Sequence, residues 1–176
     1  MDYEILQGIF SGLPSIDDPR FYLFENFYRN NKIEVLATLP WLASEVIEND
    51  GFDIMLEFVR RYGGCRIYIN KDYAAFTQKA GIALSEKTYR NMLLHSASDS
   101  VLDIPSAWGI YLKLRNVAIR LLLQSDVNLE QIARDFGMTG RALRKIMAAD
   151  SRTHHPTLSV QCICTAENNS ACLCTA

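Results

Sequence analysis

The segment from residue 129 to residue 146, LEQIARDFGMTGRALRKI, constrains this chain most, because two short helices that cross steeply need particular residues at fixed places. Gly137 stands where the chain must reverse, a position that often requires a left-handed backbone. Thr139 follows it and can cap the second helix with its hydroxyl oxygen. An apolar seam shared by both helices is expected at Ile132, Ala133, Phe136, Leu143 and Ile146. The segment therefore predicts a helix-turn-helix.

The second of these helices is expected to carry a cationic outer face. Its outward positions would be Gly140, Arg141, Arg144 and Lys145. Such a helix fits the major groove of duplex DNA, with Thr139, Arg141 and Arg144 facing the bases. Phosphate contacts are expected from Lys113, Arg115 and Lys145. Helix pairs with small residues and a glycine turn also occur in ordinary helical bundles, which is the competing interpretation.

The charge of the chain is unevenly distributed, although its net value is only −2. Residues 1–60 hold four Lys and Arg against eleven Asp and Glu, whereas residues 113–147 hold seven against three. Because attraction to phosphate depends on the local field, only the second half is expected to meet nucleic acid. The acidic first half would then serve self-association or contact with another protein.

The composition, with 49% hydrophobic and 22% charged residues, is typical of a folded soluble protein. No apolar run reaches the ~20 residues of a membrane span, and the beginning MDYEILQGIF lacks the order of a secretory signal. We therefore expect a cytoplasmic protein without a membrane partner. No phosphate loop, nucleophile elbow or HExxH motif is present, so neither an enzyme nor a cofactor is predicted.

Apolar periodicity and Gly or Pro punctuation predict a mainly α fold. Pro40 should kink or break one of the helices near Leu39. Trp41 and Trp108 are expected as core anchors, and the stretch 96–103 as a flexible loop. Helices are predicted over residues 3–10, 18–29, 33–48, 52–61, 72–79, 85–95 and 106–124.

One short β-strand is predicted at 65–70, CRIYIN, where Cys65, Ile67 and Ile69 alternate with polar or aromatic residues. In this pattern Cys65 is a buried small hydrophobe. A lone strand cannot pair its backbone polar groups. Either a second strand lies elsewhere in the chain, or the strand pairs with its own copy across a two-fold axis, and we favour the second possibility.

An acidic helical region is followed by two stretches, RYGGCRIYINKD (61–72) and RNVAIRLLLQSDVNLEQIARDFGMTGRALRKI (115–146). The same order of parts is found in the Mor family of phage transcription activators. Together the two stretches cover about a quarter of the chain. Because it contains both of them in this order, the chain resembles that family. The resemblance implies a homodimer that pairs its strands at the dyad, binds double-stranded DNA through the helix-turn-helix and has RNA polymerase as a candidate partner. It also places Gly63, Gly64, Arg66 and Tyr68 at the dyad, near the DNA backbone and minor groove, and so implies that they are DNA-binding residues.

The expected organisation is a helical dimerisation domain (1–62), a strand and linker (63–71), a helix-turn-helix DNA-binding domain (72–150) and a poorly ordered tail (151–176). The tail holds four of the five cysteines, Cys162, Cys164, Cys172 and Cys174. Four thiolates can bind zinc or copper(I), although this spacing is not that of the common structural zinc site. Disulfides, modification and an unstructured extension are the alternatives.

The sequence as a whole predicts a sequence-specific DNA-binding transcriptional regulator. Two other classes stay open at this point. One is a protein-interaction module that uses the acidic half, and the other is a metal- or redox-responsive regulator that uses the cysteine tail.

Overall fold

The computed structural model describes residues 13–96, 99–124 and 127–153, and it is mainly helical with a small two-stranded antiparallel sheet. The predicted mainly α fold is therefore confirmed. In chain order the described elements are α2 (Phe21–Asn30), α3 (Lys32–Thr38), α4 (Trp41–Asp50), α5 (Phe52–Tyr62), β1 (Arg66–Tyr68), α6 (Tyr73–Ala80), α7 (Glu86–His95), β2 (Val101–Asp103), α8 (Ala107–Leu123), α9 (Leu129–Asp135) and α10 (Gly140–Thr153).

The predicted helices between residues 18 and 124 are present, with ends that differ by a few residues. The predicted break at Pro40 is confirmed, because α3 ends at Thr38 and α4 begins at Trp41. Leu39 has extended backbone angles, φ −70° and ψ 154°, as the steric demand of a following proline requires. The helix expected at 3–10 and the tail from residue 154 onward, with its four cysteines, lie outside the described residues, whereas α10 includes residues 151–153.

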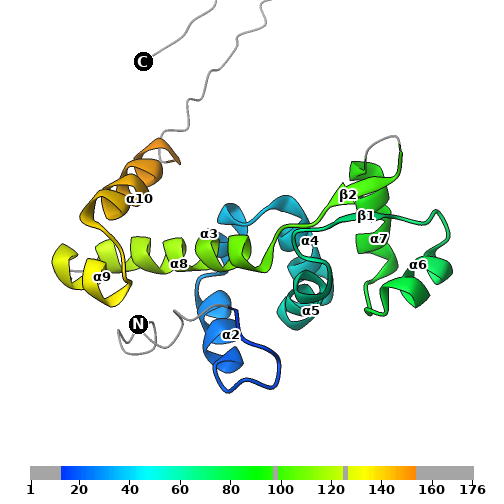
Figure 1. Cartoon of the computed structure of the whole chain (residues 1–176), viewed down its shortest axis with the longest axis horizontal. Coiled ribbons are helices and arrows are strands. Elements are labelled where there is room, and N and C mark those ends of the chain that lie inside the picture. Colours follow the sequence, from blue (N-terminus) through cyan, green and yellow to red (C-terminus); the bar gives the residue numbers. More distant parts are fainter. Residues whose placement is uncertain (1–12, 97–98, 125–126, 154–176) are drawn as a thin grey trace, which may run out of the picture.

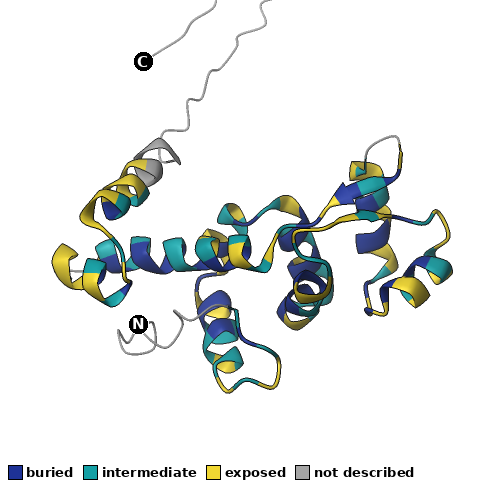
Figure 2. Ribbon diagram, in the orientation of Figure 1, coloured by how far each residue is buried: buried dark blue, intermediate teal, exposed yellow. Residues whose placement is uncertain are grey.

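The long helix α8 lies at the centre of the molecule (Figure 1). The helices α3 and α5 pack against it, and α4 packs against α5 and α7. Each of these helices and α2 contains buried residues, coloured dark blue in Figure 2. Among them are Phe24, Val35, Met55, Leu56 and Ile110. The pair α9 and α10 packs at one end of α8, and the small sheet lies towards the other end.

The strand β1 pairs antiparallel with β2, so that Arg66 lies opposite Asp103 and Tyr68 opposite Val101. The expectation of a single strand and of a flexible loop over 96–103 was therefore wrong for 101–103. The second strand has only three residues and follows a run of serines, so it gives almost no periodic signal. Since β1 has a partner within the chain, the reason given for pairing with a second copy no longer holds.

Three predicted core residues are exposed. Cys65 lies in the turn before β1 rather than on its buried face. Trp41 is 41% exposed and packs against the ring of His95, with the ring centroids 4.2 Å apart. Trp108 is 60% exposed and stacks on the buried Tyr111 at 5.0 Å. Both indole rings therefore cover a neighbouring ring from the surface instead of filling the core.

Candidate nucleic-acid interface

The turn between α9 and α10 has the geometry that the sequence predicts. The side chain of Asn128 caps α9 by accepting a hydrogen bond from the Glu130 amide at 2.8 Å. Gly137 has a φ of +57°, in the left-handed region that favours glycine. The Thr139 hydroxyl oxygen accepts a hydrogen bond from the Ala142 amide at 3.3 Å, which caps the start of α10. These local contacts fix the path of the chain from one helix to the next.

The seam between the two helices is apolar, as predicted. Ile132, Phe136 and Leu143 are buried, and Ala133 and Ile146 pack against them half-buried. Both helices also contact α8, which completes a three-helix unit. This packing determines which side of α10 is left outside.

The outer face of α10 carries the predicted residues. Gly140, Arg141, Arg144 and Lys145 are all exposed. None of the three cations forms an ion pair within the described residues. Arg134, on the exposed side of α9, adds a fourth cation that the sequence interpretation left out. The count over residues 113–147 included Arg134, but only the outward positions of the second helix were considered as contacts.

The glycine that begins α10 is not explained by packing against the described residues. A Cβ atom built on Gly140 would meet no heavy atom within 4 Å, and its φ lies outside the left-handed region. Glycine in a helix costs about 0.5–1 kcal/mol relative to alanine. The missing side chain therefore keeps the surface of α10 open at this point without helping the packing of the fold.

An apolar groove lies beside the cationic face, between α9 and α10. It has a volume of about 310 Å³ and is lined by Leu129, Glu130, Ala133, Gly140, Leu143, Arg144 and Met147. Leu129 is 46% exposed and Met147 is 41% exposed. The outer surface of this helix pair thus places apolar side chains next to the guanidinium group of Arg144.

The two phosphate contacts expected from α8 differ in their surroundings. Lys113 is exposed. Arg115 is half-buried, and its Nε atom is buried without a hydrogen-bond partner in the described part of the chain. Lys113 is therefore the more accessible of the two cations.

The remaining predicted residues lie at the other end of α8. Gly63 packs where a Cβ would stand 2.2 Å from the carbonyl oxygen of Val59, and Gly64 has a φ of +78°. The Arg66 guanidinium donates two hydrogen bonds to Asp103, at 2.8 and 3.1 Å, and this pairing holds the pKa of Asp103 below its ordinary value. Tyr68 is 57% exposed.

The structure does not bring the two groups of predicted residues together within one chain. Gly64 lies next to Ser106 at the start of α8, whereas α9 and α10 pack towards its other end. The helix has 17 residues, which corresponds to about 25 Å. Any ligand that touched both groups would have to span that length.

The described residues contain no group of three or more His, Cys, Asp and Glu side chains placed to hold a metal ion. The candidate ligands Cys162, Cys164, Cys172 and Cys174 lie outside them. Within the same residues no helix is both long and apolar enough to cross a membrane.

Comparison with known proteins gives no match to a family model, a curated protein or a solved structure.

Proposed function

We propose that this protein is a sequence-specific DNA-binding transcriptional regulator that reads the major groove with α10. The observation that carries the proposal is the outer face of that helix. It displays Arg141, Arg144 and Lys145, which form no ion pair among the described residues, and it begins with a glycine that the packing of those residues does not require. Cations without internal partners and a helix surface that a partner can approach closely are what a polyanionic duplex needs.

The proposed contacts follow from the position of each side chain. Arg141 and Arg144 have forked donors that suit the edge of a guanine, and Thr139 lies at the end of the helix that enters the groove first. Lys145 and Lys113 would contact phosphates. The absence of a side chain at Gly140 would let the backbone of α10 approach the DNA.

The apolar groove beside this face adds a way to distinguish base pairs. Leu129 and Met147 are exposed next to Arg144, so an apolar contact with a thymine methyl group is available beside a guanidinium contact with guanine. This combination supports recognition of a particular sequence over general attraction to phosphate.

We further propose that the regulator works in the cytoplasm as a homodimer, with its acidic first half facing the second copy or RNA polymerase. Residues 1–60 carry seven more acidic than basic side chains. Large apolar side chains are exposed in the same half, with Tyr22 at 66% and Ile33 at 81%. Exposed apolar groups on an acidic surface support contact with a protein and not with DNA.

Selection of duplexes from a random pool, followed by sequencing, tests this function. The full chain should enrich one motif, and a dimer should give that motif inverted symmetry. A variant that carries R141A, R144A and K145A should enrich none while it keeps the melting temperature of the wild type, because all three side chains are exposed. Equal enrichment by both proteins, or by neither, would exclude α10 as the DNA-binding helix.

A further inference from the structure

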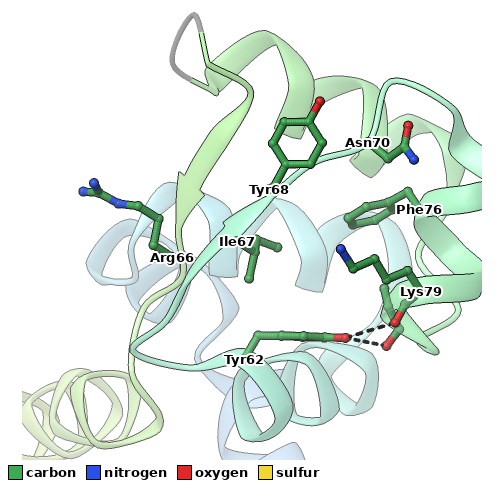
Figure 3. Close-up of a pocket in the computed structure, with 8 residues that line it drawn as sticks. Tyr62, Arg66, Ile67, Tyr68, Asn70, Phe76 and Lys79 are labelled. Atoms are coloured by element: carbon green, nitrogen blue, oxygen red, sulfur yellow. Dashed lines mark hydrogen bonds between the residues drawn. The ribbon is translucent and has the colours of Figure 1, made fainter.

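A pocket of about 330 Å³ lies between β1 and α6, at the end of the molecule away from the helix-turn-helix (Figures 1 and 3). The DNA-binding function proposed above does not use it. Its lining residues are Tyr62, Arg66, Ile67, Tyr68, Asn70, Phe76, Lys79 and Ala80.

The walls of this pocket are fixed by contacts within the chain. Phe76 and Ala80 are buried parts of α6, and Ile67 packs half-buried against the core. The Tyr62 hydroxyl donates to the carbonyl oxygens of Lys79 at 3.4 Å and Ala80 at 2.9 Å (Figure 3). Because these contacts hold the ring of Tyr62 and the end of α6 together, the pocket exists before any ligand binds.

One edge of β1 faces this pocket with its backbone polar groups. The Ile69 amide donates to the Ser100 carbonyl at 2.8 Å, and the Ile104 amide donates to the Cys65 carbonyl at 2.9 Å. In an antiparallel pair the residues that bond to the neighbouring strand alternate with residues that point away from it. The amide and carbonyl groups of Arg66 and Tyr68 therefore point away from β2, towards the side on which α6 lies.

The charge of the pocket favours an anionic ligand. Its lining contains two basic residues and no acidic one. Asp103 already pairs with Arg66. Lys79 forms no ion pair within the described residues, and its side chain points into the space in front of Ile67 (Figure 3). A carboxylate that entered this space would meet an ammonium group that has no ion-pair partner in the described part of the chain.

We propose that the groove between β1 and α6 binds an extended segment of another protein by strand addition, with a glutamate side chain in the pocket. The backbone groups of Arg66 and Tyr68 would pair with the segment, and Lys79 would bind the glutamate carboxylate. The aliphatic part of that side chain would lie on Ile67 and Phe76.

A single extended segment fits this place better than a second copy of the chain does. Since α6 lies across the pocket from β1, a neighbouring strand that carried a sheet of its own would meet that helix. A second copy would also bring its own Lys79 and Arg66 towards the same cations, without an acidic residue from the pocket lining. Charge and space together therefore favour an acidic peptide.

A titration followed by the backbone amide signals of the ¹⁵N-labelled full chain tests the proposal. The probe is a pool of capped pentapeptides with Glu fixed at the centre and Val, Ile, Thr or Tyr at the flanking positions. The amide signals of Arg66, Tyr68 and Lys79 should shift with a dissociation constant of about 1 mM or below. A pool with Gln at the centre should bind several-fold more weakly.

Two substitutions at one position separate the backbone from the side chain. Tyr68→Pro removes an amide that points away from β2, so it leaves the bonds between β1 and β2 in place and should weaken binding about tenfold. Tyr68→Ala removes only the exposed ring and should bind within a few-fold of the wild type. If Tyr68→Pro bound as the wild type does, strand addition would be excluded.

The charge is tested separately, through a residue whose replacement cannot disturb the sheet. Lys79 is exposed on α6, so the fold should tolerate its replacement. Lys79→Glu should lose the preference for the Glu pool and gain one for a pool with Lys at the centre, because the charge that faces the pocket is reversed. An unchanged preference would contradict the assignment of Lys79.

Other occupants of the groove give different results, each of which would overturn the proposal. Equal affinity for N-acetylglutamate amide would mean a site for small anions. A shift of the same signals by a DNA duplex, with none from the peptides, would mean a nucleic-acid contact. Loss of self-association in Tyr68→Pro would mean a second copy. No shift with any pool at millimolar concentration would mean that the groove binds no such segment.

Discussion

The structures at the two ends of α8 differ in how far apart in the sequence the residues that form them lie. At the helix-turn-helix end, the turn, both caps and the buried seam all come from residues 128–146. At the sheet end, β1 pairs with a strand that begins more than thirty residues later, and Arg66 pairs with Asp103, 37 residues away. A site made from one continuous segment can be inferred from its sequence. A site made by strand pairing cannot, because it depends on which distant segment pairs with the strand.

Glycine also has a different use at the two ends. A Cβ on Gly63 would overlap the end of α5 and the start of α8, so the fold itself requires that glycine. A Cβ on Gly140 would stand in open space. The first glycine is explained by packing, and we attribute the second to the proposed contact with DNA. The same substitution at each site separates these two explanations.

The largest effect is expected for Gly63→Ala. The added carbon would lie 2.2 Å from the Val59 carbonyl oxygen and 3.1 Å from the Ala107 amide nitrogen, so backbone must move. We expect the free energy of unfolding to fall by at least about 1–3 kcal/mol, measured by urea denaturation. Stability within a few tenths of a kcal/mol of the wild type would show that α5 and α8 are not held together at this glycine.

A smaller loss is expected for Gly137→Ala, because Gly137 has a φ of +57° but no heavy atom near its Cβ position. The free energy of unfolding should fall by about 1–2 kcal/mol, the cost of placing alanine in the left-handed conformation. Gly137→Asn is the control, since asparagine tolerates this conformation better and should lose less. Thermal unfolding checks both variants, and an equal loss would point to a cause other than backbone conformation.

Gly140→Ala should act in opposite directions on stability and on DNA binding. Alanine in the first turn of α10 should raise the free energy of unfolding by up to about 1 kcal/mol. Its methyl group would stand between the helix and the DNA, so affinity for the selected duplex should fall. Thermal unfolding and binding titrations of the same variant measure the two effects. Unchanged affinity would contradict the proposal that Gly140 lies against the DNA.

The smallest effect is expected from the ion pair on the sheet. The Arg66 guanidinium hydrogen-bonds to Asp103 and lowers the pKa of this carboxyl below its ordinary value of 3.8. Its contribution to stability is therefore complete above pH 3.8 and is lost as the pH falls through the lower pKa of the folded state. Both side chains are exposed, so the contribution is small.

Asp103→Asn checks this prediction. Its melting temperature should lie slightly below that of the wild type at neutral pH, and the difference should close in acid below the ordinary pKa of the carboxyl. A difference that persisted in acid would mean that this carboxyl acts by some means other than its charge.

The sequence predicted those parts of the fold whose causes are local. Pro40 separates α3 from α4, and Thr139 caps α10, because both effects act over a few residues. The failures have a common physical reason. Trp41 and Trp108 were expected in the core because of their residue type, and Cys65 because of the alternation in the predicted strand. Exposure depends instead on which other elements pack nearby.

The candidate sites show the same division. The exposed positions of α10 follow from helical periodicity once the buried seam is known. The pocket beside β1 could not be predicted, since it forms only when α6 and the end of α5 pack next to the strand. Phe76 and Lys79 carry no motif, so no pattern in the sequence marks them.

The central claim is that α10 binds DNA through its cationic face, and the salt dependence of affinity for the selected duplex tests it most directly. Wild-type affinity should fall steeply as salt rises, and Lys145→Ala should lower the slope of log affinity against log salt by about one unit. Arg141→Ala should lose about 1–3 kcal/mol of discrimination at one base pair. Wild-type slope and discrimination in both variants would contradict the claim.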